Sequence, residues 1–155
     1  AIPLEPLPRT YGDRILVAGD AAGQVKPTTG GGIYYAILAG EIAALSLQKA
    51  LSLGDFSMAQ LSYYEKKWKS VLSKELNIGR SSRNLFESLK DIQIDSLMET
   101  ISTNGIRSDV LSSQEFSFDW HQYAIIQVLG HPLLSKALRL LSPFASRIAA
   151  RIASN

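Results

Sequence analysis

The chain has no cysteine and only two histidines among its 155 residues. The absence of cysteine excludes disulfide bonds, thiolate metal sites and a cysteine nucleophile. Two isolated histidines do not supply the ligand set of a zinc site, so no metal is expected. A formal net charge of +2 is too small to indicate nucleic-acid binding by electrostatics. No metal ion and no nucleic acid are therefore expected as partners.

Long apolar runs and targeting signals are also missing. No uninterrupted apolar run approaches the roughly 20 residues that span a bilayer, and no basic segment followed by an apolar one opens the chain. We therefore expect a cytoplasmic location. The first residue is Ala1 rather than Met, and prolines at positions 3, 6 and 8 predict an extended lead-in. This abrupt start indicates a piece of a longer protein.

What is present indicates a mainly helical fold. The hydrophobic content of 46% is ample for a buried core. The apolar run Arg14–Gly19 predicts one short strand buried on both faces, as in a parallel sheet. Residues 102–117 are polar and predict a connection. Helical spacing of apolar residues extends over the remaining segments, Gly31–Leu53, Ser57–Leu76, Arg80–Leu89, Asp95–Thr103 and Trp120–Ser154.

Six of the eleven glycines lie between Gly19 and Leu45, in GDAAGQVKPTTGGGIYYAILAGEIAAL. A buried strand followed by Gly-Asp places Asp20 at the carboxyl end of a sheet, where open α/β sheets bind ligands. Gly30–Gly32 then bring bare backbone N–H groups to the start of a helix. Orphan donors and the positive end of the helix dipole favour an anion there. The alternative is a tight strand-to-helix connection without a ligand.

The spacing of this stretch resembles a flavin motif. Gly-Asp-Ala-Ala-Gly followed by Pro-x-Thr-Gly-x-Gly-Ile resembles the second flavin-binding fingerprint of FAD-dependent reductases and hydroxylases with the glutathione-reductase-like fold. Within that superfamily, DRILVAGDAAGQVKPTTGGGIYYAILAGEIAA is most similar to the geranylgeranyl reductase family, which saturates isoprenoid double bonds. The resemblance is specific from Asp13 to about Leu47. It implies the C-terminal fragment of an α/β FAD-binding fold.

The resemblance assigns FAD contacts residue by residue. It implies that Asp20 binds the ribityl hydroxyls, with the backbone of Gly19, Ala21 and Ala22 near the ribityl and pyrophosphate. It places Pro27 beside the isoalloxazine ring. The N–H donors to the pyrimidine edge would come from Thr29, Gly30, Gly31 and Gly32. Two departures are Lys26, where asparagine is frequent in the family, and Gly23, where aromatic hydroxylases usually have histidine; Gly23 favours the reductase branch.

Other family features are missing from this chain. It has no GxGxxG turn and no antiparallel sheet for a substrate cavity. We therefore expect residues 1–53 to be the C-terminal part of an FAD-binding domain and residues 54–155 a helical region, with the N-terminal FAD-binding portion absent. Such a piece would bind FAD poorly and be inactive alone. The resemblance implies hydride transfer from reduced flavin to an isoprenoid double bond, and the sequence identifies no general acid.

Two alternatives stay open at this point. One is a flavin-dependent monooxygenase of the same fold, and the other is a non-catalytic helical module that binds a lipid or a partner protein. His121 and His131 are each isolated, which favours packing or surface positions over catalysis. Arg80 and Arg83 stand one helical turn apart and could bind phosphate, but no partner is visible.

The C-terminal segment and the predicted strand suggest contacts outside the chain. In LLSKALRLLSPFASRIAARIAS, apolar residues would lie on one side of a helix and four basic residues on the other. This pattern fits peripheral binding to an anionic membrane. It fits equally a terminal helix that packs on its neighbours, with a break or kink at Pro143. The unpaired edges of the Ile15–Ala18 strand predict a dimer of the isolated piece.

Overall fold

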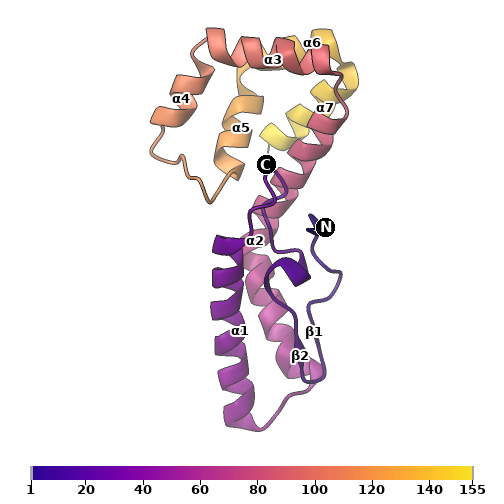
Figure 1. Cartoon of the computed structure of the whole chain (residues 1–155), viewed down its shortest axis with the longest axis vertical. Helices are drawn as coiled ribbons and strands as arrows, with labels where there is room; N and C mark the ends of the chain where they lie inside the picture. Colours follow the sequence, from indigo (N-terminus) through magenta and orange to yellow (C-terminus); the bar gives the residue numbers. More distant parts are fainter. Residues whose placement is uncertain (1, 155) are drawn as a thin grey trace. The chain divides into compact units, whose positions relative to one another are not determined.

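The computed structural model describes residues 2–154. These residues form two compact units, unit 1 up to Leu76 and unit 2 from Asn77 onward. The boundary lies inside one long helix, α2 (Met58–Glu87), so this helix contributes to both units (Figure 1). The expected functional division between residues 53 and 54 lies elsewhere, at the end of α1 (Ile33–Leu53). It stays a prediction, because compactness does not report which residues bind a cofactor.

Unit 1 begins with an extended segment and a small hairpin. Strands β1 (Tyr11–Gly12) and β2 (Ile15–Leu16) pair antiparallel, with Tyr11 opposite Leu16. The prediction of a strand buried in a parallel sheet is therefore wrong. Ile15 is 58% exposed, and the partner strand comes from the segment just before it. An apolar run of this length fits a two-residue ladder as well as a buried strand.

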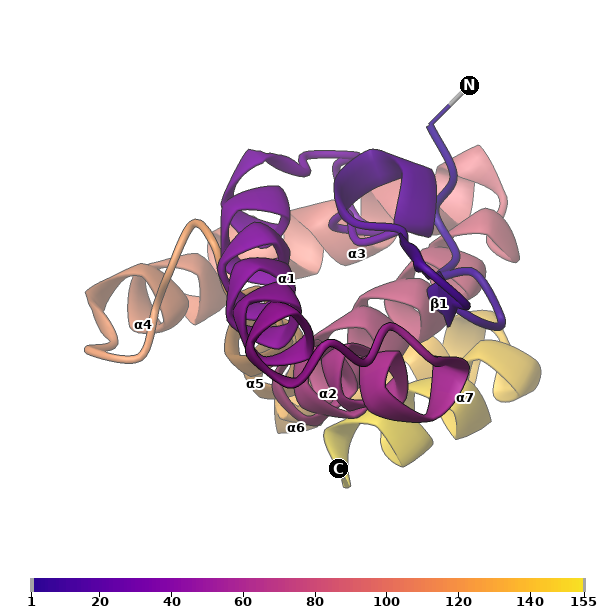
Figure 2. The same cartoon turned by 90° about the horizontal axis from the view of Figure 1, so that it is seen from below.

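The short 3-10 helix η1 (Gly19–Ala22) and α1 follow the hairpin and contact each other (Figure 2). Helix α1 buries one side, at residues spaced three or four apart: Tyr35, Ala39, Ile42, Ser46 and Ala50. Gly54 ends the helix in the left-handed conformation expected of a terminal glycine. The first part of α2 lies alongside α1, where the Nζ atom of Lys49 is 5.7 Å from the ring centroid of Tyr63.

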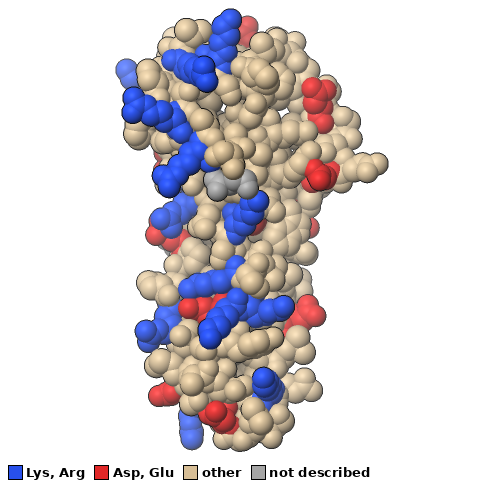
Figure 3. Space-filling view, turned by 180° about the vertical axis from the view of Figure 1, so that it is seen from behind, with Lys and Arg blue, Asp and Glu red and all other residues tan. Residues whose placement is uncertain are grey.

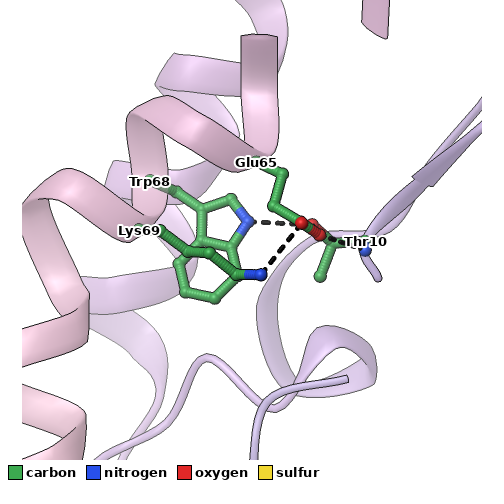
Figure 4. A network of polar contacts seen from close by, with 4 residues as sticks. All are labelled: Thr10, Glu65, Trp68 and Lys69. Atoms are coloured by element: carbon green, nitrogen blue, oxygen red, sulfur yellow. Dashed lines mark hydrogen bonds and ion pairs between the residues drawn. The ribbon is translucent and has the colours of Figure 1, made fainter. Parts of the chain in front are cut away.

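A polar network holds the extended segment on α2 (Figure 4). The Thr10 backbone N–H and hydroxyl both donate to Oε2 of Glu65, at 2.7 and 3.1 Å. The indole N–H of buried Trp68 donates to Oγ1 of Thr10 at 2.8 Å, and Lys69 donates to Oε1 of Glu65 at 2.9 Å. Although partial burial opposes ionisation, the hydrogen bonds from Lys69 and Thr10 hold the pKa of Glu65 below its usual value.

Unit 2 is entirely helical over its described residues. After the end of α2 come α3 (Asp91–Thr103), α4 (Ile106–Ser112), α5 (Gln122–Gly130), α6 (Pro132–Leu141) and α7 (Pro143–Ala153). Their core is aliphatic, and its buried members include Leu85, Leu97, Ile106, Leu129, Leu134, Leu138 and Ile152. The mainly helical fold predicted from the sequence is confirmed.

Three helix boundaries differ from the prediction. The two expected helices around Leu76 and Arg80 are one continuous helix, α2. The connection expected at 102–117 contains α4, which buries Ile106 and Val110 one turn apart. The break or kink expected at Pro143 is confirmed, because Pro143 begins α7. A further break, which was not expected, lies at Pro132, which begins α6.

Membrane-span criteria of length and composition are met by α1, contrary to the sequence-based expectation. Helix α1 contains two charged residues, Glu41 and Lys49, and the composition criterion allows two. Helices α5 and α6 would meet the criteria together, but they are bent by 72° at their junction. Core helices of water-soluble proteins meet the same criteria, so this observation is weak support for a span.

Candidate functional site

The Gly-Asp-Ala-Ala-Gly stretch forms a tight, hydrogen-bonded turn. Gly23 closes η1 with a positive φ of 70°, and its N–H donates to the carbonyl oxygen of Asp20 at 2.9 Å. A Cβ on Gly23 would collide with the backbone of Glu5 and Pro6. The N–H of Leu7 donates to the carbonyl oxygen of Ala22 at 3.0 Å. The extended segment therefore packs directly against the turn and leaves no room for a side chain at position 23.

The turn places the Asp20 side chain at the N-terminal end of α1. A Cβ on Gly32, the residue that precedes α1, would overlap Oδ1 of Asp20 and approach Val25. No side chain caps the helix at this end. A Cβ on Gly19, whose φ is 67°, would lie 3.3 Å from the Cβ of Ala36. Bare backbone at Gly19 and Gly32 thus lets η1 and the helix start approach closely.

The residues that the resemblance assigns to FAD differ in accessibility. Asp20, Ala21, Thr29 and Gly31 are exposed, and Gly30 and Gly32 are half-buried. Gly19, Ala22 and Pro27 are buried among the described residues. The exposed members form the surface on which a ligand can lie. The assignment of cofactor contacts to all nine stays a prediction.

The loop between η1 and α1 is held by its own backbone. Lys26 accepts hydrogen bonds at its carbonyl oxygen from the N–H groups of Thr29 and Gly30, and its own N–H donates to Gly31 at 2.9 Å. Gly31 N–H lies 3.3 Å from Oγ1 of Thr29. The Nζ atom of Lys26 lies 5.9 Å from the centroid of the buried Tyr35 ring. Lys26 therefore places a cation near the helix start.

Sequence reasoning missed the buried support beneath the turn. The side-chain oxygen of Gln24 accepts from the N–H of Gly19 at 2.7 Å, and its amide nitrogen donates to the hydroxyl of Tyr64 at 3.1 Å. That hydroxyl donates to the carbonyl oxygen of Val17 at 3.0 Å. Burial raises the pKa of Tyr64. The sequence offered one signal of this support, the glutamine at position 24 among small residues. Such an amide needs hydrogen-bond partners if it is buried.

The two histidines have structural positions. Nδ1 of His131 accepts from the N–H of Leu133 at 3.3 Å and so caps α6. Nε2 of His121 lies 2.9 Å from the carbonyl oxygen of Phe118. Neither belongs to unit 1, where η1 lies. These contacts fit the packing or surface positions expected for both.

The C-terminal helices bury their apolar sides in unit 2. Leu134, Leu138, Ala145 and Ile152 are buried in its core, as the packing alternative expects. The basic residues of this segment are exposed, namely Lys136, Arg139, Arg147 and Arg151. Figure 3 shows Lys and Arg side chains spread over one face of the molecule. Peripheral membrane contact stays a prediction that would depend on these cations.

The site can be compared with the chemistry of a flavin. FAD offers ribityl hydroxyls that donate hydrogen bonds, and the exposed carboxylate of Asp20 accepts them. Its isoalloxazine offers an electron-rich pyrimidine edge, and the uncapped end of α1 carries positive partial charge. The residues present therefore fit part of an FAD site. The pyrophosphate has no matching GxGxxG turn in this chain.

The curated proteins to which this chain is similar include several with the same name. No family model matches the chain. A digeranylgeranylglycerophospholipid reductase of Methanocaldococcus jannaschii is 42% identical over 103 residues, which cover 65% of this chain and 26% of the relative. A digeranylgeranylglycerophospholipid reductase of Methanothermobacter thermautotrophicus is 37% identical over 107 residues, covering 66% and 27%. The chain thus spans about a quarter of the length of these curated relatives.

One solved structure of a longer protein contains a part whose fold is similar to that of this chain. A geranylgeranyl bacteriochlorophyll reductase-like protein of Thermoplasma acidophilum superposes with a TM-score of 0.64 and 21% identity. The match covers 96% of this chain and 33% of that one. At this identity the similarity establishes the fold alone.

Proposed function

We propose that this chain is the C-terminal portion of an FAD-dependent oxidoreductase of the geranylgeranyl reductase family that reduces isoprenoid double bonds. Its named relatives are reductases, and reductases are oxidoreductases. The observation that carries the proposal is the position of the Asp20 carboxylate against Gly32, at the uncapped start of α1. Bound reduced FAD supplies the hydride for the reduction.

In this proposal the residues of the turn bind and orient the cofactor. Asp20 accepts hydrogen bonds from the ribityl hydroxyls, and Ala21 leaves space for them because its side chain is small. The N–H groups of Thr29 and Gly30 donate to the carbonyl oxygen of Lys26, and that of Gly31 lies 3.3 Å from Oγ1 of Thr29. Of the four assigned donors, Gly32 is therefore the one that would donate to the pyrimidine edge. The buried members, Gly19, Ala22 and Pro27, hold the turn in shape behind this surface.

The geometry at Gly23 supports a reductase over an aromatic hydroxylase. Hydroxylases of the superfamily usually carry histidine at this position, as the resemblance implies. Here φ is 70° and a Cβ would collide with Glu5 and Pro6. A histidine cannot be accommodated on this backbone, so the monooxygenase alternative lacks support.

A second support for a longer protein is the exposed apolar side of α1. Ile33 is 82% exposed and Ile37 68%, while nothing lies within 4 Å of the Cβ direction of Gly40. The missing N-terminal FAD-binding portion would cover this side.

A cytoplasmic location, with peripheral membrane contact through the cations of α6 and α7, completes the proposal and would be tested by cell fractionation at low and high salt.

The proposal is tested by flavin binding. FAD absorbance and fluorescence titrations would compare this chain with a protein extended upstream through the gene, and with the extended protein carrying Asp20→Ala. We expect stoichiometric FAD in the extended protein, weak binding by the chain alone, and loss on Asp20→Ala. Asp95→Ala, at an exposed aspartate of α3, is the matched control. Full FAD occupancy with Asp20→Ala would refute the assigned role of that residue, and no flavin in any of these proteins would refute the proposal.

A further inference from the structure

Unit 2 contains an apolar cavity that the flavin proposal does not use. Its volume is about 350 Å³, and it lies between the end of α2, α3, α5 and α6. Buried leucines form part of its lining, namely Leu85, Leu89, Leu97, Leu129, Leu134 and Leu138. The volume is within the range of small-molecule sites.

The mouth of this cavity is marked by two exposed, apolar side chains. Phe86 is 48% exposed and Met98 is 49% exposed, and both line the space. Methionine adapts readily to an apolar ligand because its side chain is flexible, and phenylalanine adds apolar surface. Protein interiors are close-packed, so an open apolar space of this size leaves apolar surface that a ligand can cover.

The lining determines the class of ligand. None of its residues is charged, and only Ser82 and His121 carry polar side chains. Nε2 of His121 already lies 2.9 Å from the carbonyl oxygen of Phe118. A ring compound or a polar head group would lack the placed hydrogen-bond partners that orient such ligands. A hydrocarbon chain needs none, because burial of its surface is itself favourable.

We propose that this cavity binds one isoprenoid hydrocarbon chain, with the polar end of the molecule left outside the mouth. The choice of an isoprenoid over another hydrocarbon rests on the proposed function. The cavity belongs to unit 2, whereas Asp20 and the turn belong to unit 1. The site is therefore a holding site for a chain and contains none of the proposed flavin contacts.

The test uses the two methionines of this chain as reporters. Methyl-¹³C NMR would follow Met98, on the mouth, and Met58, in unit 1, while farnesol is added without any flavin. We expect a saturable shift of the Met98 signal and no shift of Met58. Glycerol 1-phosphate, which has no hydrocarbon chain, should leave both unchanged. Unchanged Met98 at saturating farnesol would overturn the proposal.

A filling substitution gives the matched comparison. Ala124→Phe places a ring in the cavity, and we expect at least about tenfold weaker farnesol binding. Ala150→Phe, at an exposed position of α7, should bind as the unaltered chain does. Ser82→Phe places a ring in the cavity from α2 instead of α5. If Ala124→Phe does not fold, we expect the same loss of farnesol binding in Ser82→Phe. Equal binding by the filled and unaltered chains would refute the site.

Two further outcomes separate this proposal from its competitors. A Met98 signal that responds to an added N-terminal portion, but not to farnesol, would overturn the proposal in favour of a protein contact. If the upstream-extended protein binds farnesol but not FAD, the lack of FAD refutes the flavin proposal. The cavity then remains supported as a hydrocarbon site.

Discussion

At the scale of single residues, the turn depends on Gly23, where a side chain would collide with neighbouring backbone. Gly23 has a positive φ and its Cβ direction meets the backbone of Glu5 and Pro6. Gly54 has a similar φ of 63°, but nothing lies within 4 Å of its Cβ direction. The two positions therefore separate the cost of the backbone conformation from the cost of the collision.

We expect Gly23→Ala to lower the free energy of unfolding by more than about 2 kcal/mol, because strain and collision add. Gly54→Ala should cost about 1 kcal/mol, from the backbone conformation alone. Urea unfolding followed by circular dichroism measures both. Equal losses at the two positions would contradict the tight packing of the extended segment on the turn.

Glu65 makes the stability of unit 1 dependent on pH. Hydrogen bonds hold the pKa of Glu65 below its unfolded value, which is about 4.3, so folding favours its charged form. The stabilisation is present above the unfolded pKa and is lost as pH falls through the folded pKa. We expect Glu65→Gln to cost about 2 kcal/mol at pH 7 and markedly less near pH 3, because hydrogen bonds to a charged group are the stronger ones.

The measurement is urea unfolding of the unaltered chain and Glu65→Gln at both pH values, followed by tryptophan fluorescence, to which Trp68 and Trp120 both contribute. Glu41→Gln, at an exposed position of α1, is the control for the loss of one glutamate. A pH-independent cost of Glu65→Gln would show that the carboxylate charge does not matter at this position.

At the scale of elements, Ser142 separates the last two helices. Its hydroxyl oxygen accepts from the N–H of Ala145 at 3.2 Å, and Pro143 occupies the first position of α7. We expect Ser142→Ala to lower the free energy of unfolding by about 1 kcal/mol, since an orphan N–H loses its partner. Ser146→Ala, inside α7, should be neutral or slightly stabilising because alanine favours helix. Thermal unfolding of both variants decides whether the break is held by this cap.

The sequence predicted some elements well because their signals were local. The glycine pattern at 19–32 located the turn, and the helical spacing of apolar residues from Gly31 to Leu53 located α1. The Arg14–Gly19 run was misassigned because its partner strand lay in a proline-rich segment with no strand pattern. The continuity of α2 through Gly79 could not be predicted, because a glycine inside a helix depends on tertiary packing to tolerate its cost. Local chemistry therefore located the candidate site better than its supports.

The supports of the site are contacts between distant residues. Tyr64 lies 40 residues from Gln24 and bonds to it, and Glu65 lies 55 residues from Thr10. No spacing along the chain predicts which buried amide meets which hydroxyl. The cavity in unit 2 has the same origin, because its leucines come from four helices and from the connection between α2 and α3. Such features become visible only after the helices have packed.

At the scale of the whole molecule, the exposed apolar side of α1 predicts association of the isolated chain. Ile33, Ile37 and Leu51 are 82%, 68% and 67% exposed and follow each other along one side of the helix. A contiguous apolar surface of this kind favours contact with another surface. Because the chain spans about a quarter of its relatives' length, we expect this surface to be covered in the longer protein.

Sedimentation velocity measures the outcome over a range of concentrations. We expect reversible association of the isolated chain, reduced in the variant Ile33→Ser, Ile37→Ser, Leu51→Ser and absent from the upstream-extended protein. Ile92→Ser with Leu140→Ser, at exposed positions of unit 2, should leave association unchanged. If the α1 variant associates as strongly as the unaltered chain, the edges of the β1–β2 hairpin become the better candidate surface, because unpaired strand edges recruit other chains. A chain that stays monomeric at high concentration would contradict both surfaces, and the exposed side of α1 would then need no covering partner.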